Sequence, residues 1–216
     1  MADYKTVLVW DFPVRIFHLL LPISFFGAWL TAETDGYEML HYAFGYTAGL
    51  LVVFRIIWGV IGSKYSRFSD FIKGPKEIYH HIVNMMKCKF DEPYLGHNPL
   101  GALVMVALML LTLATVATGY LNLIEILGES SEELHEGVAT IMMTVVVVHI
   151  LAAIMMSFLQ KENLLKAMVT GRKKSSNQSL AIKSSHLIVG LLLLAVAGYF
   201  FWIVLIGALP QLTSDS

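Results

Sequence analysis

Four histidines lie within or beside apolar stretches of the chain, and their spacing suits metal ligation by pairs of imidazoles. These histidines are His18, His41, His135 and His149. Positions 135 and 149 are fourteen residues apart. In an α-helix that separation is an offset of about 40° around the axis and roughly 21 Å along it. One helix would therefore present two imidazoles to the same interior at two depths.

Each of these two depths has a partner histidine on another apolar stretch. We pair His41 with His135 near the outer side, and His18 with His149 nearer the cytoplasm. Helix bundles hold haem iron between two axial ligands from facing helices. The pattern therefore predicts two non-covalent b haems, one above the other, as a path for electrons. The alternative for any single membrane histidine is a hydrogen-bonding group or part of a proton path.

Two arginines are candidates for binding the haem propionates. Arg55 lies inside an otherwise apolar stretch, where an unpaired charge is costly and a carboxylate would compensate it. Arg15 is a candidate for pairing with the propionates of the inner haem. The alternative for Arg55 is a side chain that extends to the cytoplasmic headgroups. The outer loops contain no Lys or Arg, so tyrosines or backbone groups would have to serve the outer haem.

The other four histidines have weaker claims to a role. His80 and His81 fall in a cytoplasmic connection, and we expect them not to be ligands. His97 and His186 lie at the cytoplasmic starts of two apolar stretches. His97 is a weak candidate for binding a quinone headgroup. Its neighbours Asn98 and Pro99 are typical of a helix start, with Asn98 as the N-cap.

Glycines lie on the same helical face as His41. Gly45 and Gly49 follow it by four and eight residues. Without side chains they would let a macrocycle lie against the backbone. Close contact between two helices explains them equally well.

The composition indicates a membrane protein. Of 216 residues, 56% are hydrophobic and 14% are charged, whereas soluble domains average about 25% charged residues. The single cysteine, Cys88, excludes an intramolecular disulfide, a Cys-x-x-Cys-His haem attachment site and a four-cysteine iron–sulfur site.

Five stretches are long and apolar enough to span a bilayer. We expect an all-α membrane protein: a four-helix core that binds two haems, plus a fifth transmembrane helix, in one domain over residues 1–216. No cleavable signal peptide is evident. An earlier start of the first helix, near Val7, would bring His18 to the depth of His149. The expected spans are 14–31, 41–61, 100–123, 137–159 and 187–209.

The positive charges are sorted by side. The connections between the second and third spans, and between the fourth and fifth, hold most of the Lys and Arg residues, whereas the other two loops are acidic. This asymmetry predicts a cytoplasmic N-terminus. Residues 76–86 read as an amphipathic helix at the cytoplasmic membrane surface, after Pro75. Residues 171–179 are polar, and we expect them to be mobile.

Several motifs occur together in an order that resembles a known family, the bacterial cytochrome b561 group that includes the b-type cytochrome subunit of nickel–iron hydrogenases. The resemblance covers about Val7 to Leu159 and leaves the role of the fifth span open. The matching motifs are Val9-Trp10-Asp11-Phe12-Pro13-Val14-Arg15-Ile16-Phe17-His18, His41-Tyr42-Ala43-Phe44-Gly45-Tyr46, Arg55-Ile56-Ile57-Trp58-Gly59, Gly96-His97-Asn98-Pro99-Leu100-Gly101, and His135-Glu136 with His149.

The resemblance implies two b haems held by histidines of the first, second and fourth helices. It also implies a respiratory-chain protein of the bacterial inner membrane that exchanges electrons between quinone and an extracytoplasmic partner. That partner would be a c-type cytochrome or a hydrogenase-like enzyme. We therefore expect an electron-transfer subunit of a quinone-linked oxidoreductase.

Two other functions remain open on the sequence. One is a self-sufficient oxidoreductase, such as a superoxide:quinone oxidoreductase. Such an enzyme would gain from basic residues that steer an anion, and the outer loops have none. The other is a transporter or anchor without haem.

Overall fold

The computed structural model describes residues 5–87, 94–126 and 128–208. Five of its helices are long and apolar enough to cross a membrane, so the predicted class, an all-α membrane protein, is confirmed. These helices are α1 (Phe12–Thr31), α2 (Glu38–Ile61), α5 (Pro99–Leu123), α6 (Glu129–Leu159) and α8 (Leu187–Leu205).

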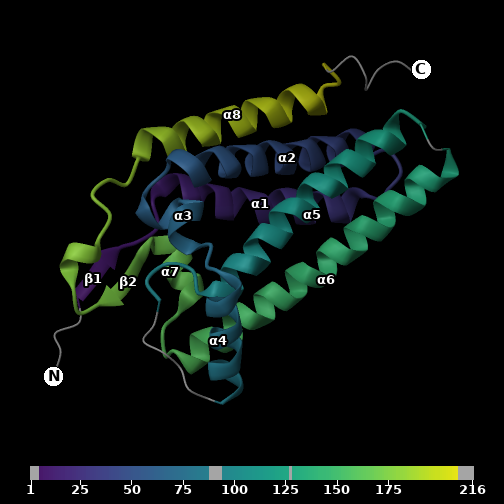
Figure 1. Ribbon diagram of the computed structural model, residues 1–216. Coiled ribbons are helices and arrows are strands. Elements are labelled where there is room, and N and C mark those ends of the chain that lie inside the picture. Colours follow the sequence, from purple (N-terminus) through teal and green to yellow (C-terminus); the bar gives the residue numbers. More distant parts are fainter. Residues whose placement is uncertain (1–4, 88–93, 127, 209–216) are drawn as a thin grey trace.

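The five long helices form an uneven bundle (Figure 1). Helices α1, α2 and α8 pack against one another, α5 packs on α2, and α6 packs on α5. The core joins side chains of four of these helices, among them Phe17, Leu51, Met109 and Leu193. The fifth span, whose role the sequence left open, therefore lies against α1 and α2 as part of the bundle.

Helix α6 is much less covered than its neighbours. In its apolar stretch 6% of the residues are buried, against 44% in α2. Among the described residues, α6 packs extensively on α5 but not on α1 or α2. One face of α6 is therefore available to something besides protein, either lipid or a bound group.

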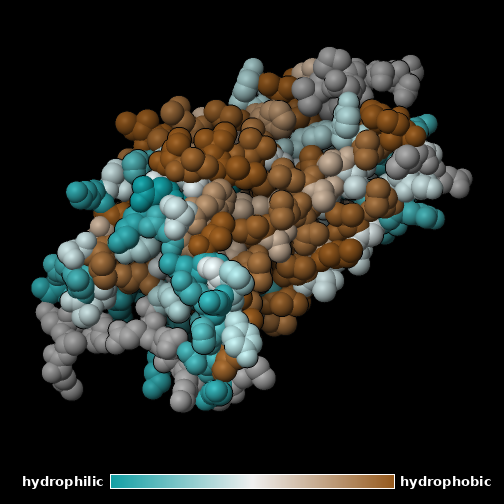
Figure 2. Space-filling view, in the orientation of Figure 1, coloured by the Kyte–Doolittle hydropathy of each residue, from teal (hydrophilic) through white to brown (hydrophobic). Residues whose placement is uncertain are grey.

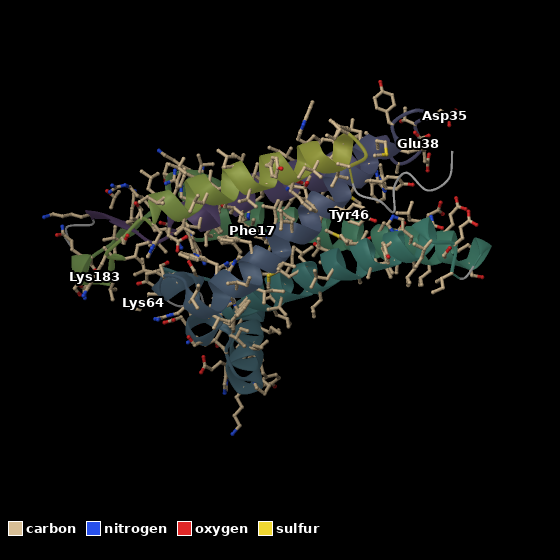
Figure 3. The ribbon with its side chains drawn as sticks, turned by 90° about the horizontal axis from the view of Figure 1, so that it is seen from above. Phe17, Asp35, Glu38, Tyr46, Lys64 and Lys183 are labelled. Carbon is tan, nitrogen blue, oxygen red and sulfur yellow. The ribbon has the colours of Figure 1, made fainter. Side chains whose placement is uncertain are left out.

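The two ends of the bundle differ in charge. Asp35 and Glu38 lie at one end, and Lys64 and Lys183 at the other (Figure 3). We call these the acidic end and the basic end. An apolar band separates them on the visible face (Figure 2). The acidic end holds the α1–α2 and α5–α6 connections, and the basic end holds the remaining connections.

Short elements cover the basic end. They include an antiparallel ribbon in which β1 pairs with β2, Lys5 opposite Ser175 and Leu8 opposite Arg172. The expectation that residues 171–179 are mobile is therefore wrong for this ribbon. Backbone pairing with the N-terminal segment holds a stretch whose composition alone suggests a loop. The short elements are β1 (Lys5–Leu8), η1 (Lys64–Ser66), α3 (Phe68–Phe71), α4 (Pro75–Met86), α7 (Leu164–Thr170), β2 (Arg172–Ser175) and η2 (Gln178–Leu180).

The start of α1 corrects a second expectation. Helix α1 begins at Phe12, and Val7 lies in β1, so a helix start near Val7 is wrong. Asp11 is the N-cap, and its carboxylate accepts a hydrogen bond from the N–H of Val14 at 2.9 Å. Pro13 in the first turn fits the same boundary.

The other helix starts agree with the sequence or extend it. Asn98 caps α5 as predicted, because its side chain accepts a hydrogen bond from the N–H of Gly101 at 2.6 Å. The predicted surface helix is α4. Helices α2 and α6 begin at Glu38 and Glu129, earlier than the expected spans at 41 and 137, since both continue past the apolar stretch into polar sequence.

Candidate functional site

The structure places His41 of α2 and His135 of α6 side by side at the acidic end. Their ring centroids are 6.1 Å apart and the rings are nearly perpendicular, at 84°. The Nδ1 atom of His41 lies 2.9 Å from the carbonyl oxygen of Ala28 in α1. That of His135 lies 3.1 Å from the carbonyl oxygen of Thr115 in α5. Backbone carbonyls of two neighbouring helices, α1 and α5, thus orient the two rings.

These hydrogen bonds leave the other ring nitrogen of each histidine available. A carbonyl oxygen can only accept, so each Nδ1 carries the proton and each Nε2 presents a lone pair. Iron-ligating and zinc-ligating histidines are commonly oriented by such a bond from the non-ligating nitrogen to a backbone carbonyl. The residues therefore fit axial ligation by two Nε2 atoms.

The space around this pair also suits a bound group. A Cβ atom built on Gly45, one turn beyond His41, would meet nothing within 4 Å. Gly49 differs, because a Cβ there would lie 3.3 Å from the side chain of Val116 in α5. Of the two explanations for these glycines, close helix packing therefore applies to Gly49, and open space remains at Gly45.

Helix α5 supports His135 closely. The hydroxyl of Thr118 lies 3.2 Å from its Nδ1, and a Cβ on Gly119 would come within 2.9 Å of its Cε1. A side chain at position 119 would displace the ring. Sequence reasoning assigned no individual role to Thr118 or Gly119, since only the crossing of α5 and α6 brings them to His135.

His18 of α1 and His149 of α6 form the second group, nearer the basic end. Both are partly buried, and they are close enough to interact electrostatically. Helix α6 is inclined to α1 in the ribbon view (Figure 1).

A third imidazole, that of His97, belongs to the same end. It interacts electrostatically with both His18 and His149. Its ring lies between aromatic side chains, 4.8 Å from Trp10 and 4.9 Å from Phe71 between centroids. Its Nδ1 atom is buried and has no hydrogen-bond partner among the described residues.

The surroundings of His97 oppose its protonation. Burial, and then the positive charge of Arg55, lower the pKa of His97 to about 3. The imidazole is therefore neutral throughout the physiological range. A neutral imidazole can donate one hydrogen bond and accept another, which suits a ligand with carbonyl or hydroxyl groups.

A buried polar network joins the start of α1, the end of α2 and the following loop. Asp11 is fully buried and accepts hydrogen bonds from the indole N–H of Trp58 at 3.0 Å and the hydroxyl of Ser66 at 2.7 Å, in addition to its cap bond. Arg55 donates from Nη1 to the carbonyl oxygen of Ser66 at 3.0 Å. The sequence signals for this network were a lone acidic residue beside Trp10 and a lone arginine in α2. Only the second of these was assigned a role.

Arg55 is 1% exposed, which rules out a side chain that extends to the headgroups. Its guanidinium also lies over the rings of Phe68 and Phe71, at 5.6 Å and 5.7 Å. Arg15 donates from Nε to the carbonyl oxygen of Val169 at 2.8 Å. Both arginines thus have protein partners, and their binding of propionates stays a prediction.

The remaining histidines lie elsewhere. His80 is exposed on α4 and His81 is buried on the same helix, while His186 packs against Trp58 at 5.2 Å. In the described part of the chain, no three His, Cys, Asp or Glu side chains are grouped so that they could hold a metal ion. Two imidazoles alone suit a metal whose other ligands come from a macrocycle.

Comparison with known proteins identifies the family of the chain. Residues 9–171 match the family described as prokaryotic cytochrome b561. The chain belongs to that family. A protein described as a probable Ni/Fe-hydrogenase B-type cytochrome subunit, from Azotobacter chroococcum mcd 1, is 27% identical over 150 residues. This alignment covers 58% of the chain and 62% of that relative.

Membership of the prokaryotic cytochrome b561 family indicates the general function of the chain. The chain is a multi-pass membrane protein, a b-type cytochrome of electron transfer that uses haem. The family match ends at residue 171, before β2 and α8. No solved structure matches the chain.

Proposed function

We propose that the protein holds two b haems, one between His41 and His135 and one between His18 and His149. The observation that carries this proposal is the acidic-end pair, whose ring centroids lie 6.1 Å apart with each Nδ1 bonded to a backbone carbonyl. His135 and His149 both lie on α6, the least covered of the long helices. When bound, the haems would supply one-electron transfer.

The protein's own residues would orient these groups. The carbonyl oxygens of Ala28 and Thr115 hold the acidic-end imidazoles in the tautomer whose Nε2 would be free to bind iron. At the basic end, Arg55 and Arg15 are the cations that would meet propionates. The apolar helices around the two pairs would limit the access of water to them.

The electron path would connect the quinone pool with a redox partner outside the cytoplasm, as in a respiratory chain. His97 is the candidate residue at the quinone, because its buried Nδ1 has no partner in the described part of the chain and it interacts with His18 and His149. A hydrogen bond between the neutral imidazole and a quinone carbonyl oxygen would place that quinone beside the basic-end haem.

The acidic end would face the partner. Its exposed carboxylates include Glu33, Asp35, Glu38, Glu132 and Glu136. They favour a partner with a basic docking surface, such as a c-type cytochrome or a hydrogenase-like enzyme. The basic end would then lie in the cytoplasm, with the N-terminus, in a bacterial inner membrane.

Quinol addition tests this proposal. The purified protein should show haem reduction when duroquinol is added, and the reduced protein should pass electrons to a basic c-type cytochrome. Lower ionic strength should speed the second step. Haem that duroquinol does not reduce would contradict the quinone link. Oxidation or reduction by superoxide as the fastest reaction would favour the self-sufficient oxidoreductase instead.

A further inference from the structure

Lys173 is a buried cation in the ribbon that covers the basic end. It is 5% exposed, whereas Arg172 and Lys174 on either side are exposed. Its ammonium lies 3.4 Å from the carboxylate of Glu162 and donates a hydrogen bond to the carbonyl oxygen of Tyr94 at 2.6 Å. A buried charge needs such partners, so this residue is held in one place.

These two contacts join three separate segments. Glu162 follows α6, Lys173 lies in β2, and Tyr94 lies three residues before His97. Glu162 is itself oriented, because its other oxygen accepts a hydrogen bond from the backbone N–H of Lys174 at 3.1 Å. Lys173 thus connects the ribbon to the irregular stretch that carries His97.

The same stretch also lies close to Tyr65. A Cβ on Gly96 would lie 3.1 Å from the ring of Tyr65, and the Tyr65 hydroxyl donates to the carbonyl oxygen of Leu180 at 2.8 Å. Asn98 then caps α5. The backbone around His97 is therefore fixed by Lys173, Tyr65 and the helix cap.

The ribbon also places the aromatic neighbour of His97. The N–H groups of Val9 and Trp10 both donate to the carbonyl oxygen of Gly171, at 2.8 Å and 3.0 Å. Gly171 has a φ of +76°, a backbone conformation that favours glycine. One end of the ribbon thus fixes the backbone at Trp10. Lys173, within the ribbon, holds the irregular stretch that carries His97.

We propose that Lys173 is a positioning residue, which holds the His97 imidazole between Trp10 and Phe71 and so shapes the site for a quinone headgroup. The inference rests on the proposed quinone function of His97. It adds a residue from the segment between α6 and α8, far in sequence from the four candidate haem ligands.

The test compares Lys173→Met, Lys173→Arg and the exposed-neighbour control Lys174→Met in the full-length protein. Hydrogen exchange of residues 94–98 is measured first, because it needs neither haem nor quinone. We expect faster exchange in Lys173→Met alone. Unchanged exchange in that variant would overturn the proposal, whatever the quinol kinetics show.

Kinetics with duroquinol then test the functional part. Lys173→Met should raise the KM for duroquinol about tenfold. This is the lower end of the loss seen when a residue that orients a ligand residue is removed. It should change kcat little and keep the haem spectrum, and Lys173→Arg should restore most of the loss. In a His97→Gln background, Lys173→Met should have no further effect on KM.

A KM that stays unchanged in Lys173→Met, or an effect that persists in full without His97, would overturn the positioning role. A wild-type protein that does not react with duroquinol would instead refute the proposed function of His97. The exchange measurement would still decide whether Lys173 holds this segment.

Discussion

The two histidine pairs differ in what surrounds them. At the acidic end, backbone carbonyls of α1 and α5 orient His41 and His135, and the rings lie 6.1 Å apart. At the basic end, His18 and His149 share their surroundings with a third imidazole, His97, and with the buried charge of Arg55. The difference favours our proposal that the acidic end only binds haem. At the basic end it favours our proposal that haem lies beside a hydrogen-bonding quinone.

The largest expected effect separates the two pairs by removing one ligand from each. His149→Ala should lose the basic-end haem and keep the other, and His135→Ala should do the reverse, because iron loses one axial ligand in each case. Haem content and low-temperature reduced-minus-oxidised spectra measure this. His80→Ala, on the exposed face of α4, is the matched control. Identical spectra for the two variants would refute the assignment of one pair to each haem.

The buried network at the basic end should matter next, through stability. Asp11→Ala leaves the indole N–H of Trp58 and the hydroxyl of Ser66 without their acceptor and removes the cap of α1. We expect a loss of about 2–4 kcal/mol in the free energy of unfolding. Thermal unfolding in detergent measures it.

Asp70→Ala is the control for this variant, because Asp70 forms an exposed ion pair with Arg67. Exposed pairs contribute about 0–1 kcal/mol. If Asp70→Ala destabilised the protein as much as Asp11→Ala, the buried network would contribute no more to the free energy of unfolding than an exposed ion pair.

A smaller and local effect is expected at the acidic end. Gly119→Ala would push a methyl group to 2.9 Å from the Cε1 of His135. The cost should be about 1–3 kcal/mol, with a shift in the midpoint potential of the acidic-end haem only. Redox titration measures the shift. Gly198→Ala, where a Cβ meets nothing within 4 Å, should leave both potentials unchanged. A shift confined to the basic-end haem would contradict the assignment of His135 to the acidic-end haem.

The smallest effect concerns pH and His97. Its pKa is about 3 in the folded protein, below its ordinary value of 6.5. Between these values the unfolded chain binds more protons, so stability should fall as the pH drops below about 6.5. Thermal unfolding from pH 7 to pH 5 should show a weaker decline in His97→Gln than in the wild type. Equal slopes would mean that His97 is not held neutral by its surroundings.

Much of this organisation could be predicted from sequence because it follows from local patterns. Apolar length predicts the five spans, and Asn98-Pro99 predicts the start of α5. The spacing of fourteen residues, close to four helical turns, puts His135 and His149 on one side of α6. The sequence also separates the acidic loops from the basic ones.

Other features depend on contacts between distant segments and could not be predicted. The ribbon of β1 with β2 pairs residues far apart in the chain, so a polar stretch reads as mobile when it is held. Asp11 looks like an interruption in an apolar run until Trp58 and Ser66 are beside it. Thr118 and Gly119 gain their importance only from the crossing of α5 and α6 at His135.

Haem quantification on the purified full-length protein tests the central claim most directly. A pyridine haemochrome assay with a protein determination gives the number of haems per chain, and acid–acetone extraction shows whether they are covalently bound. Two extractable b haems per chain are expected from the pairs His41 with His135 and His18 with His149. One haem, or none, would contradict the account.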